Sequence, residues 1–450
     1  MAEFQIACYQ NEFLPAGATR MHAVITVTAE GTSVGGPASR GNRGPEDRVE
    51  VIMLDTSGSM DGAKLQEAKA ATAAAIDSLP DGVRFAVVTG NHQAVVAYPP
   101  SPSLAVATAP ARHLAKEALR RIEARGGTAM STWISLTTHL VRDEPGTRHA
   151  ILLTDGKNES EERAQDLDKA LAKAAGVFQC DCRGVGADWI VAELRKVATA
   201  LLGTYDIVPD PAGLSADFAS MMHEALKKQI GAVTLQVRTP QGGRVEVLKQ
   251  LEPDIDLLAA RIEVDPLVGD YPTGAWGDES RDYHLCVRVP PGAVDDVPMR
   301  AAQVSLLVDG ERVCQVAVRS AWTDDVPLST HINERVAEVL GASEMAEAIQ
   351  EAIDAWRVRD DEVFTDRIGK AMTMARERGD EDVVDRLEKL AYVDPVTGLV
   401  RPKAHVDPKD VLEAETRSTR TARTGREEVA PRKERSPSSN TAPPDQDRDP

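Results

Sequence analysis

The central part of the chain alternates short apolar runs with longer segments of helical periodicity. The apolar runs lack the polar alternation of a half-exposed strand, so we predict buried parallel strands at 49–54, 83–89, 148–154, 177–185 and 204–208. Between the runs, apolar residues recur every three or four positions, as helices require. Strands that alternate with helices predict an α/β fold with a doubly wound, mostly parallel sheet. Residues 91–98 are expected to add a short antiparallel edge strand.

Three polar segments lie where the predicted strands or loops end. Asp55-Thr56-Ser57-Gly58-Ser59 follows the first strand, Gly126-Gly127-Thr128 lies in a loop, and Thr154-Asp155-Gly156 ends a later strand. Taken alone, each segment is typical of a turn or a helix cap. Doubly wound sheets, however, bind ligands at the carboxyl ends of their strands, and in the common order 3-2-1-4-5-6 strands 1 and 4 are neighbours. We therefore expect Asp55 and Asp155 to lie side by side.

Carboxylate and hydroxyl oxygens are the ligands that hard divalent cations prefer. The three segments together resemble the metal-ion-dependent adhesion site of the von Willebrand factor type A family, the fold of integrin I domains. The resemblance covers roughly residues 48–230, and all five motif positions match the family pattern. It implies that Ser57, Ser59 and Thr128 bind Mg²⁺ or Mn²⁺ through their hydroxyls. It also implies that Asp55 and Asp155 hold the ion mostly through water.

The resemblance also implies a function. In this family an Asp or Glu of another protein fills the open position on the ion, so we expect a metal-dependent protein-interaction module that acts as a scaffold or adaptor. Intracellular bacterial relatives often work beside ATPases or in stress-response and metal-resistance gene clusters. An ATPase or a stress-response component is therefore the expected kind of partner.

Two alternatives use the same residues: a metal-dependent hydrolase, and a metal site with a purely structural role. The sequence offers little to a hydrolase. A phosphatase of the haloacid dehalogenase type needs an Asp where Ser57 stands, and Ser59 lies in no Gly-x-Ser-x-Gly elbow. The chain also has no phosphate-binding Gly-x-x-x-x-Gly-Lys-Ser/Thr loop and no His-Glu-x-x-His motif. We expect no catalysis.

Composition narrows the function further. The net charge of −19 argues against a general nucleic-acid binder, because phosphate binding needs a basic face. The five cysteines are scattered through predicted strands, which favours buried reduced thiols over disulfides or a zinc site. No stretch approaches the ~20 apolar residues of a membrane span, and the first residues do not resemble a signal peptide. We expect a cytoplasmic protein.

The remaining segments differ in character. Residues 232–327 alternate apolar and polar positions around Gly242-Gly243 and Asp309-Gly310, which predicts an antiparallel β-sandwich with hairpin turns at both sites. We expect residues 1–46 to add strands to this sandwich, so that the α/β domain, residues 47–231, is an insertion. A separate N-terminal hairpin is the alternative.

The C-terminal part is expected to be helical and then disordered. Residues 328–393 have helical periodicity, with an interruption after Leu340, and predict a helical hairpin or small bundle on the sandwich. Residues 394–450 are expected to form a linker and a tail. From about Asp407 the tail is rich in Arg, Glu, Ser and Pro and should be disordered, because it buries too little apolar surface to fold.

Overall fold

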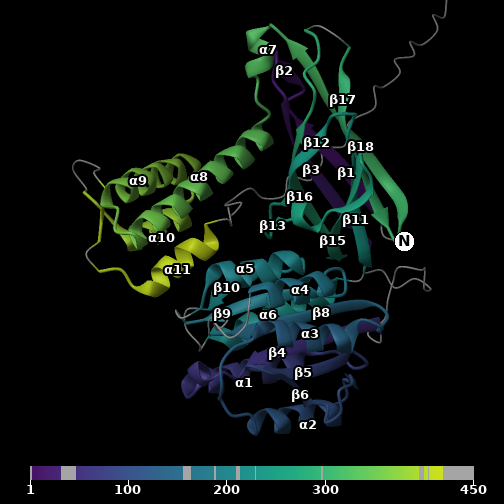
Figure 1. Cartoon of the computed structure of the whole chain (residues 1–450), viewed down its shortest axis with the longest axis vertical. Helices are drawn as coiled ribbons and strands as arrows, with labels where there is room; N and C mark the ends of the chain where they lie inside the picture. Colours follow the sequence, from purple (N-terminus) through teal and green to yellow (C-terminus); the bar gives the residue numbers. More distant parts are fainter. Residues whose placement is uncertain are drawn as a thin grey trace, which may run out of the picture.

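A computed structural model describes most of the chain (Figure 1). The described residues are 3–31, 47–155, 164–186, 189–208, 213–228, 230–294, 297–394, 400–403 and 405–418. Figure 1 shows three parts: an α/β domain at the bottom, a β-sandwich above it, and a group of helices on the left. Within the described ranges, no helix combines the length and the apolar composition that a membrane span needs.

The α/β domain is built on a seven-stranded, mostly parallel sheet with the order β10-β9-β8-β4-β5-β6, in which β7 also pairs with β5. Only β6 and β7 run antiparallel to their neighbour β5. The strands are β4 (Arg48–Asp55), β5 (Arg84–Gly90), β6 (Ala94–Tyr98), β7 (Ala105–Val106), β8 (Thr147–Thr154), β9 (Gln179–Val185) and β10 (Tyr205–Val208). Counted along the chain without the two-residue β7, this is the predicted order 3-2-1-4-5-6. The expected neighbours β4 and β8 are paired in parallel.

Helices cover both faces of this sheet and bury its apolar side chains in two separate cores. One core lies under α3, α4 and α5, and the other under α1, α2 and α6. The helices are η2 (Gly58–Met60), α1 (Ala63–Ser78), α2 (Ala109–Arg120), α3 (Met130–Val141), α4 (Ala164–Ala174), α5 (Val191–Ala200) and α6 (Leu214–Lys227). Both faces of β4 and β8 are covered by helices, and the segments that carry Asp55 and Asp155 lie at the carboxyl edge of the sheet.

The sandwich has a five-stranded sheet, β1-β3-β16-β12-β13, and a six-stranded sheet, β14-β15-β11-β17-β18-β2. Its elements are β1 (Glu3–Gln10), β2 (Phe13–Pro15), β3 (Arg20–Glu30), β11 (Ile230–Arg238), β12 (Arg244–Gln250), β13 (Ile255–Asp256), η4 (Leu258–Ala260), β14 (Ile262–Asp265), β15 (Val268–Trp276), β16 (Glu279–Arg288), β17 (Met299–Val308) and β18 (Glu311–Thr323). One core joins the two sheets. The N-terminal strands thus lie in the same sandwich as the strands that follow residue 230, and the α/β domain lies between them in the sequence.

The two predicted hairpin turns have different outcomes. Asp309-Gly310 joins β17 to β18, with φ angles of 50° and 81° that suit a tight hairpin turn. The hairpin predicted at Gly242-Gly243 was wrong. Its turn exists, since Gly243 N donates to Pro240 O at 2.9 Å, but the turn carries the chain from β11 in one sheet to β12 in the other. Strand β11 pairs with β15 and β17, and β12 pairs with β13 and β16, so the two strands that flank the turn do not pair with each other.

The helical part consists of α7 (Val326–Thr330), α8 (Glu334–Arg357), α9 (Asp361–Arg378), α10 (Glu381–Leu390) and α11 (Pro408–Arg417), with a small ladder of β19 (Ala391–Val393) and β20 (Val400–Pro402). The interruption expected after Leu340 was wrong, because α8 continues through Gly341. A glycine costs a helix about 1 kcal/mol, and burial of Val339, Ala342 and Met345 on either side outweighs that cost.

The C-terminal segment is more ordered than its composition suggests. The expectation of disorder from Asp407 was wrong for Pro408–Arg417, which form α11 and bury Val411, Leu412 and Ala414. Apolar positions three or four apart give this short helix a face that packs on the bundle. Residues 419–450, the rest of the predicted tail, lie outside the described residues.

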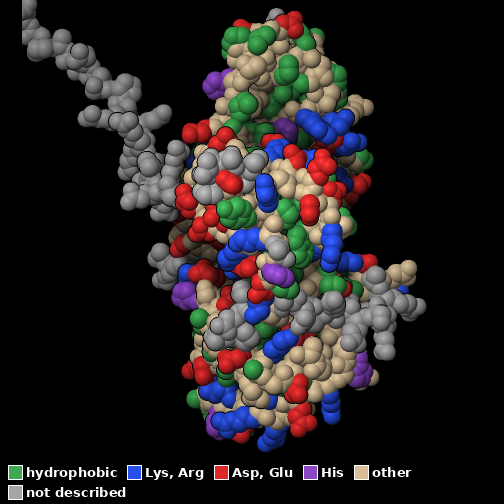
Figure 2. All heavy atoms as spheres, turned by 90° about the vertical axis from the view of Figure 1, so that its left-hand side faces the viewer, with side chains coloured by type: hydrophobic (Ala, Val, Ile, Leu, Met, Phe, Trp, Pro, Cys, Tyr) green, Lys and Arg blue, Asp and Glu red, His purple; other side chains and the backbone are tan. Residues whose placement is uncertain are grey.

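The surface that carries the helices mixes acidic and basic side chains, whereas apolar side chains gather at the tip of the molecule (Figure 2). At that tip, Phe13, Val326, Leu328 and Ile332 are exposed on β2, α7 and the segment that follows α7. The tip is the end of the molecule away from the α/β domain (Figure 1).

Candidate metal centre

Asp55 and Asp155 meet at the carboxyl edge of the sheet. Asp55 ends β4, and Asp155 directly follows β8, the parallel neighbour of β4. Both side chains are 0 % exposed. Thr154, the last residue of β8, donates its hydroxyl to Asp55 Oδ2. The strand order therefore brings two buried carboxylates together from positions 100 residues apart in the sequence.

The two serines connect these carboxylates. Ser57 N donates to Asp55 Oδ1 at 2.7 Å, the hydroxyl oxygens of Ser57 and Ser59 are 3.0 Å apart, and Ser59 Oγ donates to Asp155 Oδ1 at 2.8 Å. Four of the five predicted site residues thus form one continuous hydrogen-bonded chain. Ser57 is buried, whereas Ser59 is exposed to solvent.

Thr128 lies on a loop that is held against the serines. Arg125 N donates to Thr56 O at 2.7 Å, and Gly58 N donates to Gly126 O at 2.8 Å. Gly126 has a φ of 79°, and a Cβ there would lie 2.6 Å from the ring of His92, so this position needs glycine. Thr128 is buried and precedes α3 by two residues. None of the hydrogen bonds that join the other four residues includes Thr128.

The electrostatics of the site favour a bound cation. Burial raises the pKa of Asp55 to about 6, and the charge of Asp155 adds to this rise, while hydrogen bonds from Thr154 and Ser57 oppose it. A buried carboxylate beside a second one is more easily ionised when a positive charge is near. A cation in contact with both carboxylates would stabilise their ionised forms.

One charged neighbour escaped the sequence analysis. Lys64 Nζ donates to Asp155 Oδ2 at 2.5 Å and forms an ion pair with it. Lys64 is the second residue of α1, the helix that follows the site loop. This position could have identified Lys64 from the sequence. The first turn of α1 follows the end of β4 closely, so its side chains lie near the carboxyl edge of the sheet.

The donor set fits a hard divalent cation. Asp55, Ser57, Ser59, Thr128 and Asp155 together offer carboxylate and hydroxyl oxygens, which suit Mg²⁺ or Mn²⁺. In the described part of the chain, no group of three or more His, Cys, Asp or Glu side chains could hold a metal. A metal centre in this part of the chain therefore depends on the hydroxyls of serine and threonine.

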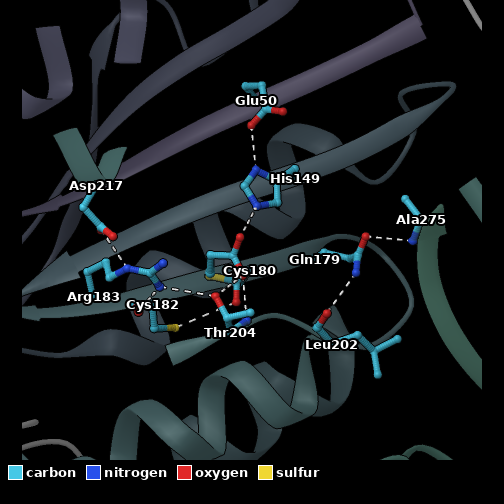
Figure 3. Close-up of polar contacts among 11 residues, drawn as sticks. Glu50, His149, Gln179, Cys180, Cys182, Arg183, Leu202, Thr204, Asp217 and Ala275 are labelled. Atoms are coloured by element: carbon cyan, nitrogen blue, oxygen red, sulfur yellow. Dashed lines mark hydrogen bonds and ion pairs between the residues drawn. The ribbon is translucent and has the colours of Figure 1, made fainter. Parts of the chain in front are cut away.

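A second buried charge cluster lies in the same sheet (Figure 3). His149 of β8 sits between two carboxylates, with Nδ1 2.8 Å from Glu50 Oε2 of β4 and Nε2 3.0 Å from Asp181 Oδ2 of β9. Asp181 also accepts hydrogen bonds from the backbone and hydroxyl of Thr204, at 2.6 and 2.8 Å. The sequence analysis missed this cluster, because its members sit inside strands that read as apolar.

Another contact in Figure 3 joins the α/β domain to the sandwich. The side chain of Gln179 donates to Leu202 O and accepts from Ala275 N of β15, both at 2.9 Å. Gln179 begins β9, at the amino edge of the sheet. This contact with the sandwich therefore lies at the edge of the sheet opposite the metal centre.

Comparison with known proteins identifies the family to which the chain belongs. The sequence matches the von Willebrand factor type A domain over residues 50–207 and the von Willebrand factor type A C-terminal domain over residues 373–418. A solved structure, von Willebrand factor type A from Catenulispora acidiphila, is 44% identical, with a TM-score of 0.86, over 94% of this chain and 97% of that one. The chain belongs to the von Willebrand factor type A family. This confirms the resemblance found in the sequence.

Two further relatives set the limits of the comparison. The ArnB paralog VWA2 from Sulfolobus acidocaldarius covers 93% of this chain and 98% of its own, with a TM-score of 0.58, but at 15% identity it shows the fold alone. The uncharacterized protein sll0103 of Synechocystis sp. is 27% identical over 164 residues. That match spans 36% of this type A protein and 37% of sll0103. The type A C-terminal match includes α11, which makes this helix part of a family domain.

Proposed function

We propose that the type A domain docks a protein partner through Mg²⁺ or Mn²⁺ held by Asp55, Ser57, Ser59, Thr128 and Asp155. The chain would then act as an intracellular scaffold or adaptor. One observation carries the proposal: the hydrogen-bonded chain from Asp55 through Ser57 and Ser59 to Asp155, at the edge of the sheet where ligands bind in this fold.

The arrangement of the side chains suits docking. The two carboxylates are fully buried, whereas Ser59 is exposed, so a molecule that approaches from solvent meets the hydroxyl side of the site first. When bound, Mg²⁺ or Mn²⁺ would supply an electrophilic position for an Asp or Glu carboxylate of the partner. The neutral hydroxyls would bind the ion without cancelling its charge, and the buried carboxylates of Asp55 and Asp155 would balance that charge from the protein side.

We further propose that the site binds and does not catalyse. Ser59 bonds to Ser57 and Asp155, and neither of these hydrogen bonds is made to a histidine, the base that most often activates a serine nucleophile. The partner class stays the one that the sequence suggests, a protein such as an ATPase or a stress-response component, with no role for nucleic acid. All five cysteines are free thiols, which supports a reducing compartment such as the cytoplasm.

The test combines metal binding with partner capture. We expect calorimetric titration to detect Mg²⁺ or Mn²⁺ binding by the wild type at millimolar concentrations or below. We expect Asp55→Ala and Thr128→Ala to abolish or strongly weaken it. Asp77→Ala is the matched control, because Asp77 is an exposed carboxylate on α1 that pairs with Lys116. Pull-downs with and without EDTA should show a partner that both site variants lose.

Three results would contradict the proposal. Absence of divalent-ion binding at millimolar Mg²⁺ removes the metal site. If a folded Asp55→Ala protein captures the same partner, the metal is not needed for docking and has only a structural role. Turnover of a phosphate ester or anhydride in a substrate panel would instead favour the hydrolase.

A further inference from the structure

Each carboxylate of the metal centre is bonded differently. Asp55 accepts from Ser57 N and from the Thr154 hydroxyl, which are neutral donors. Asp155 accepts from the Ser59 hydroxyl on Oδ1 and from the Lys64 ammonium, at 2.5 Å, on Oδ2. The site therefore already contains one positive charge, in contact with the carboxylate that a metal ion would share.

We propose that Lys64 is a tethered cation that balances the charge of the empty site and competes with the divalent ion, so that it sets the metal affinity of the docking site. This inference rests on the proposed function, since it concerns the same five residues. It adds a residue outside the metal-binding motif and assigns it a regulatory role.

The position of Lys64 suits competition. Its side chain is 28% exposed, while that of Asp155 is 0% exposed, so the ammonium reaches a buried carboxylate from the solvent side. A lysine carries a compact charge on a flexible four-carbon stem. It can leave the carboxylate and return to water without moving the backbone of α1.

The attachment of Lys64 to α1 makes its ammonium an effective competitor of the metal ion for Asp155. Because Lys64 is the second residue of α1, next to the site loop, its ammonium remains near Asp155 even when the ion pair opens. A tethered group acts at a high effective concentration. An incoming dication must displace the ammonium or bind beside a like charge, and both lower its affinity. Occupancy would then follow the free Mg²⁺ concentration, and the site would hold its shape without metal.

The experiment compares metal binding by the full chain before and after removal of this charge. Lys64→Met keeps the length of the side chain without its charge, and Lys64→Gln is a second neutral variant that can still donate a hydrogen bond to Asp155. Lys69→Met is the matched control, because Lys69 lies on the same helix but donates to a backbone carbonyl, Ile122 O, at 2.6 Å. Calorimetric titration with MgCl₂ and MnCl₂ gives the dissociation constants.

We expect both Lys64 variants to bind Mg²⁺ about tenfold more tightly than the wild type, as the loss of a like charge a few ångströms from the ion implies. Lys69→Met should stay within about twofold of the wild type, because its charge contacts no site residue. The melting temperature of metal-free Lys64→Met should fall and recover on addition of Mg²⁺, since the ion replaces the lost partner of Asp155.

Two results overturn it, and they differ in what they say about docking. If the wild type binds Mg²⁺ and the folded Lys64 variants bind it equally or more weakly, Lys64 positions Asp155 for the metal and does not compete. The docking proposal then stands. If neither the wild type nor any Lys64 variant binds a divalent ion, both the competition and the metal-dependent docking fail.

Discussion

Two groups of charged residues in the α/β domain differ in their charge balance. At the carboxyl edge, Asp55 accepts from neutral donors, whereas Asp155 accepts from the Ser59 hydroxyl and the Lys64 ammonium. In the middle of the sheet, one histidine bridges Glu50 and Asp181, and its protonated ring can donate one N–H to each carboxylate. In the second group a histidine lies between the two carboxylates, whereas in the first a cation from solution would add charge compensation for Asp55. This contrast is the reason that the metal is expected at one group and not at the other.

His149 should make stability depend on pH. Burial lowers the pKa of His149, but the charge of Glu50 and the hydrogen bonds to Asp181 and Glu50 outweigh it and raise the pKa to about 10. The unfolded value is ~6.5. The stabilisation is therefore complete below about pH 6.5 and is lost as the pH rises toward 10. We expect the free energy of unfolding to fall by at most about 1.4 kcal/mol per pH unit in this window.

The histidine variant tests this linkage. His149→Gln should unfold more easily at pH 6.5 and should lose the slope between pH 7 and 9.5, because no group is left to release the proton. His113→Gln, at an exposed position of α2, should keep the wild-type slope. Urea titrations across the pH range measure both. Parallel profiles for the wild type and His149→Gln would show that His149 is not the group that titrates.

At the scale of elements, the sequence predicts what depends on local patterning. The buried runs, the helices between them and the Asp309-Gly310 hairpin follow from periodicity and turn chemistry, and the known rules of α/β sheets then place Asp55 beside Asp155. What depends on distant partners could not be predicted. The turn at Gly242-Gly243 says nothing about which sheet β12 joins. The position of Lys64 in the first turn of α1 places it at the same edge as Asp155, but no local pattern shows that the two side chains form an ion pair.

Gly90 shows how the packing of elements supports the site. It ends β5, and its carbonyl accepts from the backbone and hydroxyl of Thr56 at 2.7 and 3.1 Å. A Cβ at Gly90 would lie 2.2 Å from the ring of Trp133, which is fully buried on α3. A rigid buried indole cannot move aside cheaply. The close approach of β5 and α3 therefore holds the segment that carries Ser57.

We expect Gly90→Ala to destabilise the protein by about 1–3 kcal/mol through overpacking, and to weaken Mg²⁺ binding because Thr56 shifts with the strand end. Gly213→Ala is the control, since the nearest atom to a Cβ there, Val208 Cγ1, is 3.8 Å away. Urea denaturation gives the stability and calorimetry the affinity. A Gly90→Ala protein with wild-type stability would mean that α3 can adjust its packing.

At the scale of the molecule, the helical part contacts both other parts. The start of α8 packs Val336 and Val339 on Val24 of the sandwich, and the Arg335 guanidinium lies 4.0 Å over the ring of Tyr9. At the other end, α11 reaches the α/β domain, where Arg417 Nε is 3.3 Å from Asp206 Oδ1 of β10. The helical part therefore connects the sandwich to the α/β domain through contacts with both (Figure 1).

Helix α11 is held against α8 by polar and apolar contacts. Its Glu415 carboxylate accepts from Arg357 at 2.5 Å, and its backbone carbonyl accepts from Gln350 at 3.1 Å, both on α8. The buried face of Val411, Leu412 and Ala414 adds apolar contact. The segment that composition alone assigns to a tail is thus needed to connect the bundle to the α/β domain.

Two truncations separate α11 from the residues beyond it. Deletion of residues 408–450 removes the contacts to α8 and β10 and exposes apolar surface of the bundle, so we expect the melting temperature to fall by about 5 °C or more. Deletion of residues 419–450 should change it by about 1 °C or less, because the Arg-, Glu-, Ser- and Pro-rich composition buries little surface. Differential scanning calorimetry measures both. If the shorter deletion destabilises the protein as much as the longer one, the last 32 residues contribute to the fold and the compositional argument fails there as well.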